Sequence, residues 1–72
     1  MTRTPTQLEQ RLTAYRQTGA ITQREFHILV LRYQHNLTLN QIALALDVSR
    51  GTVTSTLRRA RQKIELHERE AA

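Results

Sequence analysis

Cationic and hydroxyl side chains gather in residues 50–63, and these residue types suit contact with a polyanion. The stretch holds four arginines and one lysine, which are all the positive charges between residues 37 and 64. Between them stand threonine, serine and glutamine, whose side chains hydrogen-bond to phosphates and to base edges. At about 100° per residue, the face of such a helix opposite its apolar side chains consists of Gly51, Ser55, Arg58 and Gln62. The pattern predicts a helix with one cationic, hydrogen-bonding face that carries no large apolar residue.

Catalytic and metal-binding residue types are scarce. The chain has no cysteine, one aspartate and two serines. Its three histidines, His27, His35 and His67, lie on separate segments without a nucleophile or carboxylate at a recognisable spacing. They also lack the spacing of zinc ligands. We therefore expect a protein that is not an enzyme and that binds neither a cofactor nor a metal.

Length and charge narrow the class of protein further. The 72 residues carry a formal net charge of +5 with a sequence pI near 11.1, which fits a polyanionic partner. A chain this short predicts one domain, residues 1–72, with a modest core held by helix packing alone. The sequence has no apolar run long enough for a membrane span, no signal-peptide pattern, and no basic helix with a broad apolar face. We therefore expect a soluble cytoplasmic protein that is associated with the nucleoid and does not bind membrane.

Two apolar stripes, joined by a short turn, position the cationic stretch. The first consists of Ile42, Ala43 and Leu46, and the second of Val53, Leu57, Ala60 and Ile64. Between them, Asp47 tolerates the left-handed conformation that ends a helix, and Ser49 suits the N-cap of the next helix. The arrangement predicts a helix-turn-helix over residues 38–63, whose second helix enters the major groove of DNA.

Helix-start signals recur along the rest of the chain. Capping boxes are expected at Thr22 and Thr38, each three residues before a glutamate or glutamine. Thr4 is expected to cap the first helix ahead of Pro5, and Asn36 suits a left-handed exit from the second helix. The sequence thus predicts an all-α, four-helix domain with helices at about residues 5–18, 22–35, 39–46 and 50–67.

The second helix is apolar around most of its circumference and is expected to form the centre of the core. The predicted core residues are Leu12, Phe26, Leu29, Ile42, Val53 and Leu57. Leu44 projects away from the stripe of its own helix, and we expect it to pack against the first or second helix. The alternative for Leu44 is an exposed anchor for a partner. Residues 65–72 carry three glutamates and one arginine, and we expect them to form a frayed, solvated end.

Docking geometry predicts a division of DNA contacts along the fourth helix, with bases contacted by its first turns and phosphates by its later turns. Ser55 and Arg58 are expected at base edges, where Arg58 suits a bidentate contact with guanine. Phosphate contacts are expected mainly from Arg50, Arg59, Arg61 and Lys63. The complete predicted DNA-binding set is Thr38, Arg50, Gly51, Thr52, Thr54, Ser55, Arg58, Arg59, Arg61, Gln62 and Lys63. A single arginine is more often part of a solvated helix face, but the grouping favours DNA.

The order of the motifs resembles the C-terminal, promoter-reading domain of bacterial sigma factors. An Arg-Glu helix start, an LRY segment, an LTL-x-x-IA helix and a VS-R-G-TV helix ending in Arg-Ala-Arg follow one another, and the resemblance covers residues 8–65. It implies duplex DNA binding by Arg50, Gly51, Thr52, Thr54, Ser55 and Arg58. In that family the domain also touches the flap of RNA polymerase. Asp47 and Asn36 stand where the family usually has glycine, and both residue types tolerate the left-handed conformation.

A working sigma factor also needs a domain that opens the promoter and binds the polymerase core, and we expect none in these 72 residues. We therefore expect a free-standing transcriptional regulator, a small repressor that reads a double-stranded operator through residues 50–67. Because one recognition helix reads only a few base pairs, we expect it to bind an inverted repeat as a homodimer. The competing hypothesis is a sigma-like adaptor that docks on RNA polymerase or another regulator through protein contacts.

Overall fold

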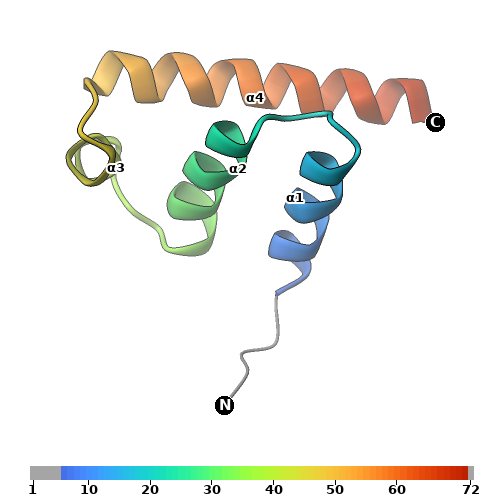
Figure 1. Cartoon of the computed structure of the whole chain (residues 1–72), viewed down its shortest axis with the longest axis horizontal. Helices are drawn as coiled ribbons and strands as arrows, with labels where there is room; N and C mark the ends of the chain where they lie inside the picture. The colour runs from blue at the N-terminus through green and yellow to red at the C-terminus, as the bar shows by residue number, and fades with distance from the viewer. Residues whose placement is uncertain (1–5, 72) are drawn as a thin grey trace.

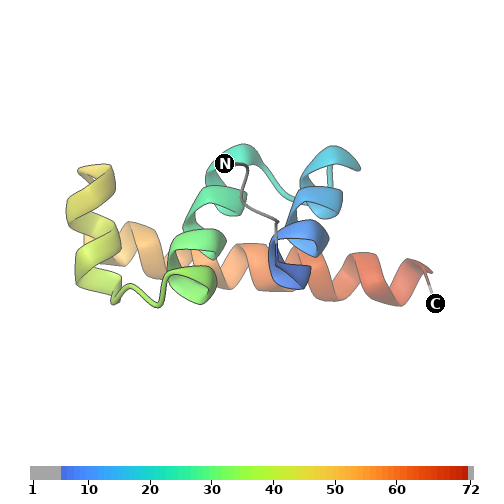
Figure 2. The ribbon, with the colours of Figure 1, turned by 90° about the horizontal axis from the view of Figure 1, so that it is seen from below.

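The computed structural model describes residues 6–71, and within that part of the chain all regular structure is helical (Figure 1). The elements are α1 (Gln7–Gln17), α2 (Gln23–Leu29), a π-helical turn η1 (Val30–Gln34), α3 (Leu39–Leu46) and α4 (Arg50–Ala71). α4 runs along one edge of the molecule, α1 and α2 stand side by side against it, and α3 lies at its N-terminal end (Figures 1 and 2). This arrangement confirms the expected all-α, four-helix fold, in which α3 and α4 form the helix-turn-helix.

Local hydrogen bonds begin the helices where the sequence predicts them. Thr22 and Thr38 each close a capping box, in which the threonine Oγ1 accepts from the backbone N–H three residues later at 3.1 Å. Ser49 Oγ accepts from the N–H of Thr52 at 3.1 Å and so caps α4. Asp47 has a φ of 56° where α3 ends, which is the left-handed conformation that aspartate tolerates. The turn of the helix-turn-helix therefore forms without a glycine.

The start of α1 differs from the prediction. Thr6, and not Thr4, caps this helix, because Thr6 Oγ1 accepts from the N–H of Glu9 at 3.2 Å. Thr4 and Pro5 lie outside the described residues. α1 is therefore shorter at both ends than residues 5–18.

The C-terminal end of α4 also differs from the prediction. The helix continues to Ala71, beyond the predicted end at about residue 67, so the expectation of a frayed end is wrong, whereas residues 65, 66 and 68–70 are solvent-exposed as expected. Glu68 joins this end to α1, because its carboxylate accepts from the Tyr15 hydroxyl and pairs with Arg11 at 3.2 Å. The Tyr15 hydrogen bond and the Arg11 charge hold the pKa of Glu68 below its ordinary range. Helix α1 thus holds the last turns of α4.

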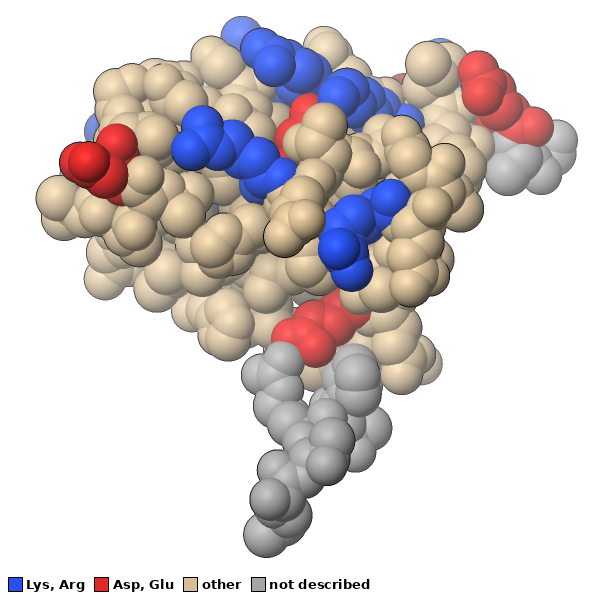
Figure 3. Space-filling view, viewed as in Figure 1, with Lys and Arg blue, Asp and Glu red and all other residues tan. Residues whose placement is uncertain are grey.

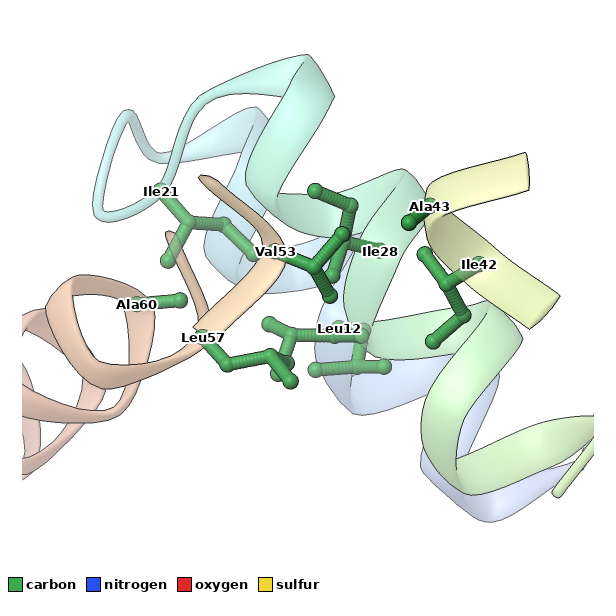
Figure 4. Packing of buried hydrophobic residues seen from close by; sticks show 9 residues of the cluster. Leu12, Ile21, Ile28, Ile42, Ala43, Val53, Leu57 and Ala60 are labelled. Atoms are coloured by element: carbon green, nitrogen blue, oxygen red, sulfur yellow. The ribbon is translucent and has the colours of Figure 1, made fainter. Parts of the chain in front are cut away.

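Nine buried apolar side chains from the four α-helices and the loop before α2 form the core (Figure 4). They are Leu12, Ile21, Ile28, Leu29, Ile42, Ala43, Val53, Leu57 and Ala60. The prediction that Phe26 belongs to this set is wrong, because Phe26 is only partly buried at the edge. Its ring instead supports the guanidinium of Arg16, 4.9 Å from the ring centroid. Glu25, one residue earlier, occupies the buried position of the first turn of α2.

Leu44 is 83% exposed, so the expectation that it packs against the first or second helix is wrong. Helix α3 packs against α4 and η1, with Ile42 and Ala43 buried. Successive helical residues are about 100° apart, and Leu44 therefore projects from another side of α3 into solvent.

The second predicted helix, residues 22–35, is interrupted by a change of helix type. From Val30 its hydrogen bonds span five residues, and the N–H of His35 donates to the carbonyl of Val30 at 3.2 Å. π-helical turns are rare and occur frequently at functional sites. This one carries Arg32 and Tyr33, and the side chain of Tyr33 contacts α4.

Candidate nucleic-acid interface

The N-terminal half of α4 presents its cationic face to solvent. Val53, Leu57 and Ala60 are buried on one side of the helix. The exposed residues opposite them include Gly51, Ser55, Arg58, Arg59 and Gln62. In Figure 3, lysine and arginine side chains lie along the α4 edge and also over the middle of the face, and acidic side chains lie at the C-terminal end of that helix and at scattered places elsewhere. The face predicted from the periodicity is thus the accessible face of the second helix of the motif.

Several hydroxyl groups at the start of α4 already have partners within the protein. Ser49 Oγ caps the helix and also lies 2.9 Å from the Thr52 hydroxyl. The Thr54 hydroxyl donates to the carbonyl of Arg50 at 3.1 Å. Thr54 keeps acceptor capacity but has already used its single donor within the protein, and one of the two hydroxyls of Ser49 and Thr52 donates to the other.

Two basic side chains of α4 are held by the fold. The guanidinium of Arg61 donates to the Tyr33 hydroxyl and lies 5.5 Å from the centroid of the Tyr33 ring. Lys63 Nζ lies 3.0 Å from one carboxylate oxygen of Glu25 and 3.1 Å from the other. Neither contact was foreseen from the sequence, because each joins residues that are far apart in the chain.

Between Arg50 and Gln62, five exposed polar side chains of α4 make no hydrogen bond or ion pair with the rest of residues 6–71. They are Arg50, Ser55, Arg58, Arg59 and Gln62. Arg58 and Arg59 lie on either side of the direction in which Ser55 points. At Gly51, an added Cβ would meet only Ser49 Oγ, at 3.9 Å, so the fold itself leaves room for a side chain there. These positions are therefore available to an external hydrogen-bonding partner.

A hollow of about 340 Å³ lies along one flank of α4, between that helix, η1 and the start of α3. Its lining is Arg32, Leu39, Thr54, Leu57, Arg58, Arg61, Gln62 and Glu65. Arg32 donates to the carbonyl of Leu37 at 2.8 Å, which fixes its guanidinium beside the hollow. The sequence analysis did not select Arg32, although it is the lone charge between Phe26 and Tyr33 apart from the histidine, and such a residue calls for a polar partner.

Thr38 stands at the start of α3, next to Leu39 of this hollow. Its Oγ1 accepts from the N–H of Gln41 and its own N–H donates to the Gln41 side chain at 2.8 Å. The residue is exposed and its hydroxyl acts only as an acceptor in the cap, so its one donor is available to solvent or to a ligand. Thr38 therefore borders the same flank as Arg32 and Arg58.

Residues 6–71 contain no cluster of three or more His, Cys, Asp or Glu side chains able to hold a metal ion. Within the same residues, no helix has the length and apolar character that crossing a lipid bilayer requires.

Comparison with protein families identifies the fold's relatives. Residues 19–65, more than half of the chain, match the family model described as sigma-70, region 4. The chain belongs to the sigma-70 region 4 family. Domains of this family are DNA-binding helix-turn-helix domains of transcription and are not enzymes. None of the curated proteins and none of the solved structures compared with the chain gives a significant match.

The region 4 match includes α2, η1, α3 and most of α4, and it confirms the resemblance seen in the sequence. It leaves out α1 and the last turns of α4. These two segments contact each other through Tyr15, Arg11 and Glu68. In this region 4 domain the matched helices carry the whole cationic face, and the unmatched segments pack together at the opposite end of α4.

Proposed function

We propose that the protein is a sequence-specific, double-stranded DNA-binding regulator, a small repressor that reads an operator through α4. The observation that carries the proposal is that some polar side chains of this helix are bonded within the protein, whereas others are exposed and have no partner there. Arg50, Ser55, Arg58, Arg59 and Gln62 are exposed and have no partner within residues 6–71. Four of these side chains, Ser55, Arg58, Arg59 and Gln62, lie on the helix face opposite the buried stripe. That face carries no large apolar residue and suits the polar edges of base pairs.

Docking as in other helix-turn-helix proteins assigns a role to each group. Ser55 and Arg58 contact base edges from the first turns of α4, and Gly51 allows the backbone to approach the groove. Arg59 lies on the other side of Ser55, within reach of a base or the second strand's phosphates. Gln62 follows one turn after Arg58. A bidentate Arg58 contact favours guanine.

The hollow beside α4 is proposed to receive a backbone phosphate. Arg32, Arg58 and Arg61 line it, and its single carboxylate, Glu65, is paired with Arg69 at 2.7 Å. The first helix of the motif crosses the DNA backbone, and the start of α3 borders this hollow. We assign Lys63 mainly to the fold, because the buried Glu25 carboxylate already holds its ammonium group.

Because one recognition helix reads only a few base pairs, we propose that two chains bind an inverted repeat as a homodimer. The protein would act at the nucleoid, in the cytoplasm. The decisive experiment is selection of bound duplexes from a random DNA pool. A palindromic consensus, bound with two protein chains per duplex in sedimentation, supports the proposal. Recovery of no consensus from the pool would contradict sequence-specific binding.

A second candidate function is supported by the exposure of Leu44. A leucine that is 83% exposed suits the centre of a protein contact, and α1 adds an apolar hollow of about 420 Å³ against η1 and α4. In this function the domain is a sigma-like adaptor that docks on RNA polymerase or another regulator. Binding of purified polymerase without any selected DNA consensus would favour the adaptor over the repressor.

A further inference from the structure

Tyr33 of η1 holds a basic side chain that borders the proposed DNA surface. Its hydroxyl accepts a hydrogen bond from the Arg61 guanidinium, and its ring lies 5.5 Å from the guanidinium carbon. We propose that Tyr33 is a positioning residue for DNA binding, which fixes Arg61 in the orientation that meets a backbone phosphate. This inference rests on the proposed function and names a residue on which the strength of phosphate contact depends.

The two contacts leave part of the guanidinium available. One N–H group of Arg61 donates to the hydroxyl and the guanidinium carbon lies 5.5 Å from the ring centroid, while the other N–H groups of Arg61 make no hydrogen bond or ion pair with residues 6–71. A guanidinium carries five N–H donors in a rigid fork, so one donor can bond to the hydroxyl while the others are left for an anion. Holding the side chain in advance also lowers the conformational entropy lost when a phosphate is bound.

The position of Arg61 explains why it needs holding. Arg61 lines both the hollow beside α3 and the apolar hollow beside α1. Glu65 stands four residues later on the same helix, a spacing at which an arginine and a glutamate form an ion pair. Glu65 is paired with Arg69 at 2.7 Å. Without Tyr33, the Arg61 side chain would be free to turn out of the hollow and share that carboxylate, which would weaken its positive charge next to the DNA.

Arg32, which lines the same hollow, is also held by an uncharged partner. Arg32 is fixed by the carbonyl of Leu37 at 2.8 Å, so two of the three arginines of the hollow are oriented by partners on or just after η1. Both partners are uncharged, so the contacts orient the guanidinium groups and leave their positive charge uncompensated. The single carboxylate in the lining of the hollow, Glu65, is paired with Arg69 at 2.7 Å, so the converging guanidinium groups suit an anion such as a phosphate.

The test is a double-mutant cycle on the whole chain, with a labelled random-sequence duplex as the probe and titrations at several salt concentrations. Arg61→Ala should lower the salt slope of binding by about one, as expected for the loss of a phosphate contact. Tyr33→Leu should lower the slope by a similar amount although every charge is retained, and Tyr33→Phe should lie between it and the wild type. In the Arg61→Ala background, neither tyrosine substitution should have a further effect.

Tyr15→Phe is the matched control, because it removes the chain's other tyrosine hydroxyl, which bonds to Glu68. It should leave the salt slope unchanged even if it lowers the melting temperature. If folded Tyr33 variants bind with the wild-type slope, or if their effect is as large without Arg61 as with it, the inference is overturned. Should Tyr33→Leu fail to fold, the inference is tested by the salt slopes of Tyr33→Phe in the wild-type and the Arg61→Ala backgrounds. A wild-type chain that binds no DNA would overturn the proposed function, whereas failure of the inference alone leaves wild-type binding intact.

Discussion

Lys63 of α4 and Glu25 of α2 form an ion pair in which the acidic partner is buried. The Glu25 side chain is 4% exposed, whereas that of Lys63 is 39% exposed. The same carboxylate accepts from the N–H of Thr22 at 2.7 Å and so completes the capping box of α2. One side chain thus starts a helix and ties that helix to the recognition helix.

Acid should weaken the fold through this pair. Burial by itself raises the pKa of Glu25, but the Thr22 hydrogen bonds and the Lys63 charge outweigh burial and hold the pKa below its ordinary value. A carboxyl whose folded-state pKa is lowered stabilises the fold above its unfolded-state pKa, and this stabilisation is lost as the pH falls through the lower folded-state value. The free energy of unfolding, measured by urea titration across the acid range, should therefore decrease as the pH is lowered.

Glu25→Gln should flatten part of that pH dependence, and Glu68→Gln should flatten another part, since the pKa of Glu68 is also lowered.

Lys63→Met should cost about 1–3 kcal/mol at neutral pH, because it leaves a buried carboxylate without its cation. A Lys63→Met protein as stable as the wild type would show that the pair contributes nothing.

Leu57→Ala should lower the free energy of unfolding by about 2–5 kcal/mol, because it leaves a cavity between α4 and the rest of the core. Leu57 is 7% exposed and belongs to the buried cluster. Leu66→Ala is the matched control: the same substitution on the same helix at a residue 56% exposed should change stability by less than about 0.5 kcal/mol. Thermal melts that give equal losses for both would contradict the core assignment.

Arg58→Ala should weaken binding to the selected operator by about 1–3 kcal/mol and affect random DNA much less, because a base contact discriminates between sequences. Arg69→Ala provides a control on the same helix, since Arg69 is paired with Glu65 beyond the proposed groove contact. Fluorescence anisotropy on both duplexes measures the difference. Equal losses on operator and random DNA would reduce α4 to an electrostatic contact.

Leu44→Glu should leave stability within about 0.5 kcal/mol of the wild type, because the side chain is exposed and supports no core contact. If Leu44 anchors a partner, the substitution should abolish capture of purified polymerase while operator binding persists. Thr38→Ala removes the cap of the same helix and should cost about 1 kcal/mol of stability. It therefore separates loss of polymerase capture through destabilisation of α3 from loss of the Leu44 contact itself. Retention of polymerase by Leu44→Glu would remove Leu44 from any docking surface.

The sequence by itself determined the parts of the protein that depend on neighbouring residues. Capping boxes at Thr22 and Thr38, the Ser49 cap and the left-handed Asp47 all involve atoms within a few residues, so their residue types predict them. Apolar periodicity placed Val53 and Leu57 on the buried face of α4, because that pattern also depends only on residues within a few positions of each other. The motif order also sufficed for the family.

Only the tertiary structure decided which side chains of α4 remain available to a partner. The contacts of Arg61 with Tyr33 and of Lys63 with Glu25 join residues 28 and 38 positions apart, and they depend on how η1 and α2 pack against α4. The same packing exposes Leu44 and moves Phe26 to the edge of the core. A residue's type states what it can bind, but its availability depends on which helix lies beside it, and periodicity within one helix does not contain that information.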